Sequence, residues 1–175
     1  MKRYDKYSED RQIQDALDEY NKIYTKKLNI EELLLTMIIS REETNELNIL
    51  IKRKIGINHK NRFGNSPLLA AIENNANMSG DYYETITKLL IDNGADINIQ
   101  NSKGITPLIL SMRLNNIDLF FYLLEQDNIN LNIKDNKKLD IFDYLSDKYI
   151  NIIKDKYSDK YKKYIRNNKA KKFNL

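Results

Sequence analysis

The feature that most constrains the fold of this chain is a passage that occurs twice. Residues 64–71 read GNSPLLAA and residues 104–111 read GITPLILS. Each copy is followed by an apolar stretch that contains a Leu-Leu pair, at residues 89–90 and 123–124, and then by a polar segment. Repetition of one short unit predicts a stacked array, because such a unit buries its apolar face only against its neighbours.

Each copy also carries the residues that begin a helix. Ser66 and Thr106 are N-cap types, whose hydroxyl can accept a hydrogen bond from a free backbone N–H. Pro67 and Pro107 suit the first helical position, where no N–H is needed. Gly94 suits the end of the second helix in the first unit, where φ is positive. Each unit is therefore predicted to consist of a turn, two helices and a second turn.

The apolar positions of the two units predict a buried layer between them, with small residues that let the helices approach closely. The layer is expected to contain Leu68, Ile72, Leu89 and Leu90 in the first unit and Leu108, Met112, Leu123 and Leu124 in the second, with Ala70, Ala71 and Ser111 as the small residues.

The Gly-x-Thr-Pro-Leu opening at Gly104, the Leu-Leu pairs and the Gly-Ala-Asp-x-Asn segment at residues 94–98 resemble the ankyrin repeat, whose usual period is about 33 residues. The resemblance implies an all-α, helical-repeat solenoid of ankyrin type. In it, helix-turn-helix units are joined by short β-turn or hairpin loops, and about four units are expected here, including divergent terminal ones. It also implies a protein-protein interaction module that acts as an adaptor, a tether or a sequestering inhibitor.

Two departures from the family pattern stand out. The usual histidine after Thr-Pro-Leu, which links neighbouring repeats, is replaced by Leu69 and Ile109, so this polar link is expected to be missing. The first unit is about 40 residues long, and its surplus falls in residues 75–81, which have the composition of a turn. Asp81 and Glu84 are spaced as a capping box that restarts the second helix.

We expect a single domain over residues 1–175, since no Gly-, Ser- or Pro-rich linker divides it. Its parts are predicted as an N-terminal covering helix (1–28), a divergent repeat (29–60), a repeat with an insertion at 75–81 (61–100), a second full repeat (101–134), a divergent repeat with a C-terminal capping helix (135–168) and a basic tail (169–175).

Helix starts can be predicted in the N-terminal part as well. Ser8 is a candidate N-cap of the covering helix, Asn29 to Glu32 form a candidate capping box for a helix through Ile39, and Ser40 to Glu43 form another.

The composition argues against catalysis. The chain has no cysteine, and its one histidine, His59, falls in a predicted turn, so neither a thiolate site nor a cluster of metal-binding histidines is possible. Five glycines form no phosphate-binding loop. We therefore expect no enzyme activity, no cofactor and no metal.

The sequence also bears on where the protein acts. No apolar run reaches about 18 residues, so no membrane span is expected, and the cytoplasm is the expected location. The chain is rich in Asn, Lys and Ile, which fits an AT-rich genome and suggests a viral or host-associated bacterial origin, with the host cytoplasm or nucleus as a setting.

The resemblance places the working surface on the turns between units and on the first helix of each unit. The expected partner-binding residues are Lys60, Arg62, Phe63, Asn65, Glu73, Asn74, Gln100, Ser102, Lys103, Ile105, Arg113, Leu114, Lys134, Asn136, Lys137, Leu139 and Lys148. The turns are basic, so we expect the partner to be another protein with an acidic surface. The chain itself is expected to be a monomer. Phe63, Ile105 and Leu139 either anchor that partner or pack between adjacent turns.

The C-terminal segment offers an alternative function. Lysines alternate with tyrosines over residues 154–172, a pattern that could bind nucleic acid or another anionic surface. The candidate phosphate contacts are Lys160, Lys163, Arg166, Lys169, Lys171 and Lys172. However, Ile150, Ile153, Tyr157, Tyr161 and Tyr164 share one helical stripe, which favours a cap over the last repeat.

Overall fold

The computed structural model describes residues 6–23, 28–41, 44–77 and 82–168, and these ranges contain helices and turns but no strand. The helices are α1 (Lys6–Ile23), α2 (Ile30–Ile39), α3 (Asn45–Lys52), α4 (Pro67–Asn77), α5 (Tyr82–Asp92), α6 (Pro107–Arg113), α7 (Ile117–Glu125), the 3₁₀ turn η1 (Ile141–Tyr144), α8 (Asp147–Lys156) and α9 (Ser158–Asn168).

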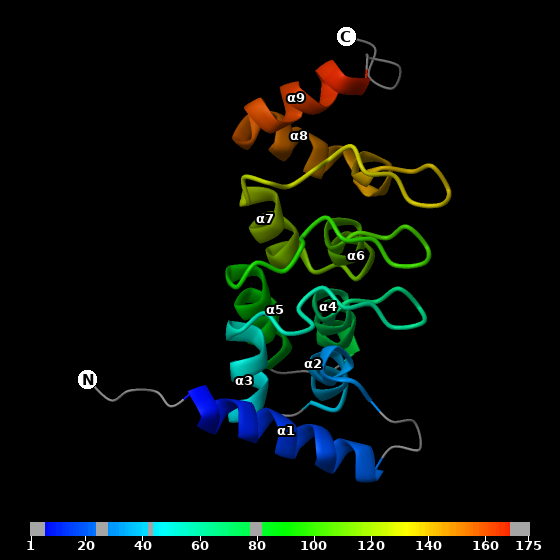
Figure 1. The fold of residues 1–175 in the computed structure, drawn as a ribbon. Coiled ribbons are helices and arrows are strands. Elements are labelled where there is room, and N and C mark those ends of the chain that lie inside the picture. The colour runs from blue at the N-terminus through cyan, green and yellow to red at the C-terminus, as the bar shows by residue number, and fades with distance from the viewer. Residues whose placement is uncertain (1–5, 24–27, 42–43, 78–81, 169–175) are drawn as a thin grey trace, which may run out of the picture.

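The helices pair in chain order and the pairs stack into two columns (Figure 1). One column contains α2, α4, α6 and η1, and the other contains α3, α5 and α7. Long loops project to one side from the first column, and α1 and α9 lie at opposite ends of the stack. The expected all-α helical-repeat solenoid is therefore confirmed.

The two full repeats begin as predicted. The backbone N–H of Leu69 donates to Ser66 Oγ at 3.3 Å, and the N–H of Ile109 donates to Thr106 Oγ1 at 3.2 Å. Pro67 and Pro107 are the first residues of α4 and α6. The sequence motif therefore acts locally, because each hydroxyl satisfies a backbone donor that the helix leaves free.

The N-terminal caps were predicted with mixed success. The box at the start of α2 is present, with the N–H of Glu32 donating to Asn29 Oδ1 and the N–H of Asn29 donating to Glu32 Oε2. Ser8 is not an N-cap, because it lies inside α1, where its hydroxyl accepts from Gln12. The box predicted from Ser40 is also wrong, since Ser40 ends α2 and Thr44 caps α3.

The buried side chains form one continuous core along the stack. Most of the predicted layer is buried, including Leu68, Leu90, Leu123 and Leu124. Leu89 and Met112 are only half-buried and pack against its edge. The burial of the Leu-Leu pair thus differs between the units. Leu123 and Leu124 both lie inside the core, whereas of the pair in α5 Leu90 is inside the core and Leu89 is not.

The longer first unit lengthens its first helix. α4 continues to Asn77, so the surplus predicted as a turn at residues 75–81 is helical in its first part. Asp81, the proposed cap residue of α5, lies outside the described residues.

The last unit is shorter than its predecessors. Its first helix is reduced to η1, which Asp140 caps together with Asp143. The expected C-terminal helix is divided into α8 and α9 at Tyr157, whose backbone leaves the helical region at φ −121° and ψ 40°. Ile150, Ile153, Tyr161 and Tyr164 are buried as the predicted stripe requires, whereas Tyr157 is half-buried and its ring stacks on Phe121.

Candidate partner-binding surface

Three loops that project from the first column share one hydrogen-bond scheme. They are named fingers 1, 2 and 3: residues 60–65, 100–105 and 134–139. In finger 1, Asn61 Oδ1 accepts from the backbone N–H groups of Phe63 at 2.9 Å and Asn65 at 3.1 Å. Asn101 and Asp135 make the same two bonds in fingers 2 and 3. One side-chain oxygen therefore ties the tip of each finger to its base, as in an Asx-turn.

The fingers are also bonded to one another. The backbone N–H of Ser102 donates to the carbonyl of Phe63, and that of Asn136 donates to the carbonyl of Lys103, each at 3.1 Å. Side chains add a second bond at both junctions, from Ser102 Oγ to Phe63 O at 2.7 Å and from Asn136 Nδ2 to Ser102 O at 2.9 Å. The three fingers therefore form one connected row rather than three independent loops.

The close approach of the fingers explains their glycines. Gly64 and Gly104 have φ of 74° and 75°, and a Cβ at either position would lie within 2.4 Å and 2.7 Å of the backbone nitrogens of Ser102 and Asn136. Lys138 occupies the same place in finger 3 and has φ of 64°. No further finger crosses finger 3 in the described chain, which explains why a side chain fits there.

The surface of this row is basic. Its exposed cations are Lys60, Arg62, Lys103, Lys134, Lys137 and Lys138. The acidic residue within the three fingers, Asp135, is 6% exposed and accepts a bond of 2.5 Å from the Tyr144 hydroxyl. Its charge is therefore directed into the fold, and the side chains that face solvent on the row carry positive charge.

Burial and hydrogen bonding act on Asp135 in opposite directions. Burial on its own raises the pKa of this carboxyl, but the bonds from Tyr144 and from the N–H groups of Leu139 and Lys137 outweigh it and hold the pKa below its usual value. The group is therefore ionised at neutral pH, and it raises the pKa of Tyr144 by holding the phenolic proton.

The three apolar finger residues differ in exposure. Phe63 is 57% exposed, and the Arg62 guanidinium lies 4.7 Å from its ring centroid. Ile105 is 3% exposed and belongs to the core, so it cannot contribute to a docking surface. Leu139 is half-buried. Packing in the core therefore accounts for Ile105, whereas the ring of Phe63 is largely open to solvent.

Several other predicted residues have structural partners. Gln100 donates to the carbonyls of Gly104 and Lys134, and Lys60 donates to the carbonyl of Gln100. These bonds join fingers 1, 2 and 3, so Gln100 contributes to the shape of the row more than to its exposed face.

The remaining predicted residues lie beside the row or apart from it. Glu73 is exposed on α4, where it accepts from Asn65, and Asn74 is half-buried. Arg113 is exposed at the end of α6 and Leu114 caps that helix. Lys148 is exposed in the first turn of α8, where its ammonium lies 5.6 Å from the Tyr149 ring centroid.

A second set of hydrogen bonds joins neighbouring repeats, and the sequence analysis, which considered only the missing family histidine, did not predict it. Asn58 Oδ1 accepts from the backbone N–H of Asp96, and Asn98 repeats this contact with the N–H of Asn130 while donating to the carbonyl of Asn128. The recurrence of Asn at these two places in the sequence was the available signal. These amides link neighbouring units although the usual histidine is absent.

The alternative phosphate-binding surface loses one of its members. Lys160 Nζ donates to the carbonyls of Leu124 at 2.6 Å and Gln126 at 2.7 Å, so its ammonium caps the C-terminal end of α7. Burial lowers the pKa of Lys160. Lys169, Lys171 and Lys172 lie outside the described residues. Lys160 therefore has a structural role that a phosphate contact would disrupt.

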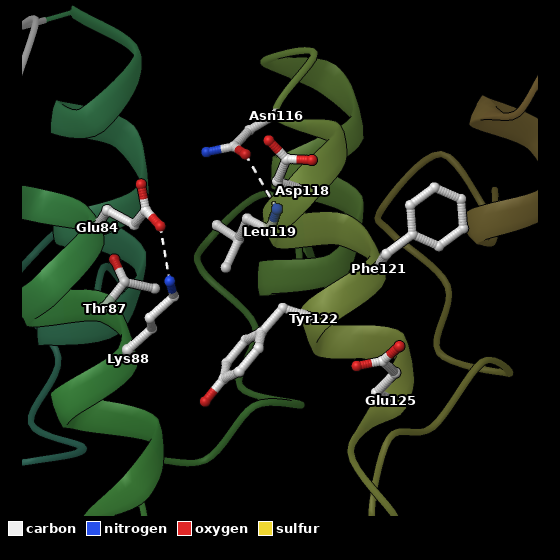
Figure 2. A pocket seen from close by; sticks show the side chains of 9 residues that line it. All are labelled: Glu84, Thr87, Lys88, Asn116, Asp118, Leu119, Phe121, Tyr122 and Glu125. Carbon is white, nitrogen blue, oxygen red and sulfur yellow. Dashed lines mark hydrogen bonds and ion pairs between the residues drawn. The ribbon is translucent and has the colours of Figure 1, made fainter. Parts of the chain in front are cut away.

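A cavity of about 300 Å³ lies between α5 and α7 (Figure 2). Three of its charged groups are engaged within the protein: Lys88 bonds to Glu84 at 2.7 Å, and Glu125 accepts from Tyr157 at 3.0 Å. Tyr122, on the α7 side, donates to Asp92 at 3.2 Å. The ion pair explains why the pKa of Lys88 is raised, chiefly by its bond to Glu84. This arrangement contains neither a nucleophile paired with a base nor a cluster of free ligands.

Possible metal-binding groups and membrane-spanning helices were considered for the residues that the structure describes. His59 lies 3.6 Å from Glu31, as a pair near the first finger, and within the described ranges no group of three or more His, Cys, Asp or Glu side chains could hold a metal ion. None of the helices in those ranges is both long and apolar enough to cross a membrane.

Comparison with known proteins agrees with the stacked units and their fingers. A family model of three ankyrin repeat copies matches residues 34–135 and 76–155. The chain therefore belongs to the ankyrin repeat family, whose members are in general protein-protein interaction modules. It is also 40% identical over 76 residues to an ankyrin repeat protein of Rickettsia bellii (strain RML369-C). The match covers 43% of this chain and 41% of that protein.

Proposed function

We propose that this protein binds an acidic surface of another protein through the row of three fingers. The observation that carries the proposal is that the row is held together by hydrogen bonds while its exposed charges are positive. A surface that is already ordered loses little conformational entropy on binding, and complementary charge increases the rate of association.

Phe63 supplies the apolar part of this surface. It is exposed at the tip of finger 1 among cationic side chains, and Arg62 lies over its ring. Aromatic residues surrounded by polar groups contribute a large share of the binding free energy at interfaces. We therefore expect Phe63 to be the main anchor, with Lys103, Lys134 and Lys137 directing the approach of the partner.

The role that follows is that of an adaptor, a tether or a sequestering inhibitor, acting as a monomer. The cytoplasm is the proposed setting.

The test is a capture experiment with the wild type beside a Lys103→Glu/Lys134→Glu variant. Both side chains are exposed, so the reversal leaves the fold intact. We expect a discrete protein to be captured by the wild type and its affinity for the variant to fall by roughly tenfold or more, with a loss that shrinks at high salt. The affinities of the purified partner for the wild type and for the variant, measured at low and high salt, test this expectation.

A Lys52→Glu/Lys162→Glu variant is the matched control, because it changes the net charge equally at exposed positions outside the fingers. Equal loss of binding in the control and the finger variant would contradict the proposal. Capture of nucleic acid alone, released by salt and lost on truncation after Asn167, would support the C-terminal alternative instead.

A further inference from the structure

A groove of about 510 Å³ lies at the N-terminal end of the solenoid, between α1 and the junction of α2 with α3. It arises because α1 packs mainly against α3 and crosses the end of the stack beneath both columns (Figure 1). The groove is separate from the three fingers, none of whose residues line it.

The groove has an apolar floor, and an exposed apolar side chain, Ile23, lies beside it. Met37 and Tyr20 are buried, Ala16 is half-buried, and Ile23 is 70% exposed at the end of α1. An isoleucine left so exposed beside a hollow is a site where a partner side chain could remove apolar area from water.

The rim of the groove is acidic. Asp15, Glu19 and Glu46 line it, and among the residues that the structure describes the lining contains neither lysine nor arginine. Arg11 approaches Asp15 to 3.9 Å, but both side chains are largely exposed, and such pairs contribute little. The charge is thus opposite to that of the fingers, in a chain whose formal net charge is +4.

We propose that this groove binds a basic amphipathic helix of a partner protein. Apolar side chains of the helix would contact Ile23 and Ala16, and its lysines or arginines would lie against Glu19 and Glu46. Three features of the groove support this occupant: it runs along α1, its floor is apolar, and its rim carries one sign of charge. An amphipathic helix that lays its apolar face into a hydrophobic groove is a recurring mode of recognition, and the acidic rim selects a helix whose polar face is basic.

The probe is a synthetic helical peptide of about 15 residues, long enough to be marginally helical alone. It has leucines on one face, lysines on the other and a fluorescent label. A matched peptide carries glutamate in place of each lysine. Binding is measured by fluorescence anisotropy at low and high salt, and isoleucine and methionine methyl signals are followed by NMR. We expect the basic peptide to bind at low salt and to shift the methyl signals of Ile23 and Met37, and the acidic peptide to do neither.

Two variants test the two parts of the groove separately. Glu19→Lys/Glu46→Lys reverses the rim charge, and Ile23→Asp removes the exposed apolar group without entering the core. We expect each to weaken binding of the basic peptide by about tenfold, which corresponds to about 1.4 kcal/mol. Thermal melts of both variants should lie close to that of the wild type, because Glu19 and Ile23 are exposed and Glu46 is only half-buried, in the first turn of α3.

The Lys103→Glu/Lys134→Glu variant distinguishes this site from the fingers, and we expect it to bind the basic peptide as the wild type does. The proposal would be overturned by any of three results: no binding at millimolar peptide, methyl shifts confined to other parts of the molecule, or equal binding by Ile23→Asp. Self-association of the protein at low salt that Glu19→Lys/Glu46→Lys abolishes would assign the groove to a second copy of this chain instead.

Discussion

At the scale of single residues, positive φ occurs at the same place in every finger but under different constraints. Gly64 and Gly104 must lack a side chain, because a Cβ at either position would clash with the backbone of the next finger. Lys138 bears only the intrinsic strain of the left-handed region. The same backbone conformation thus has different energetic costs for a side chain. Where a neighbouring finger lies against the position, a steric clash is added to the strain of positive φ.

Substitutions at these positions should therefore have opposite effects. Gly104→Ala should lower the free energy of unfolding by roughly 2 kcal/mol or more, since strain at positive φ adds to a clash with the backbone of finger 3. Lys138→Gly should change the free energy of unfolding by less than about 1 kcal/mol. We expect a small increase, because the relief of strain at positive φ slightly exceeds the entropy that glycine adds to the unfolded chain. Urea unfolding of both variants measures the difference, and equal effects would refute the role of the neighbouring finger.

Sequence reasoning at this scale succeeded where a residue type has one local use. Ser66 and Thr106 cap helices because a hydroxyl before proline has a free N–H within reach. It failed at Ser8, where a hydroxyl of the same kind lies within a helix and bonds to Gln12. A cap residue signals a helix start only if the residues before it are not helical, and local composition does not report that.

At the scale of the elements, the spacing of apolar residues predicted the helices well but not how deeply each side chain is buried. α5 and α7 both contain a Leu-Leu pair, yet Leu89 lies at the edge of the core while Leu123 is inside it. The difference comes from the neighbouring helices, which a single helical period does not encode.

Truncation of the Leu-Leu pair in α5 tests this distinction. Leu90→Ala should destabilise the protein by about 2–5 kcal/mol, because the side chain is fully buried and its removal leaves a cavity. Leu89→Ala should cost clearly less, since part of its surface already contacts water. Thermal melts of both variants decide, and a larger loss for Leu89→Ala would contradict the packing of α5.

In the C-terminal elements, the predicted set of buried positions is correct although the predicted single helix is wrong. The buried positions of residues 150–164 follow helical spacing, but the chain breaks at Tyr157 into α8 and α9. Tyr157 donates to Glu125 and stacks on Phe121, both in α7. Contacts with a different unit therefore favour the break, and such contacts are not encoded in the local pattern.

At the scale of the whole molecule, the stacked arrangement of helical units followed from the duplicated passage, because stacking leaves a repeat few other ways to bury its apolar face. The arrangement of charge did not follow from it. The basic fingers were apparent in the sequence, whereas the acidic groove combines residues of α1 with residues of α2 and α3 that only the packing of α1 brings together.

Stacking also predicts how stability is distributed along the molecule. Units in the middle have neighbours on both sides, whereas the last unit has a single 3₁₀ turn in place of its first helix. We expect amide hydrogen exchange to be slowest in α4 to α7 and faster in α2, α3 and α8. Exchange measured by mass spectrometry tests this, and uniform protection would indicate that the solenoid opens as one cooperative unit.

The side chain at Lys138 has a consequence for extending the array. Any additional repeat inserted after finger 3 must lay its own finger across this position, as finger 3 lies across Gly104. A lysine there blocks that contact, so an engineered longer array needs glycine at 138 before a fourth finger can join the row. The residue type at this one position thus decides whether a further finger can stack. In related arrays, a residue other than glycine at the equivalent position should mark the last finger of the row.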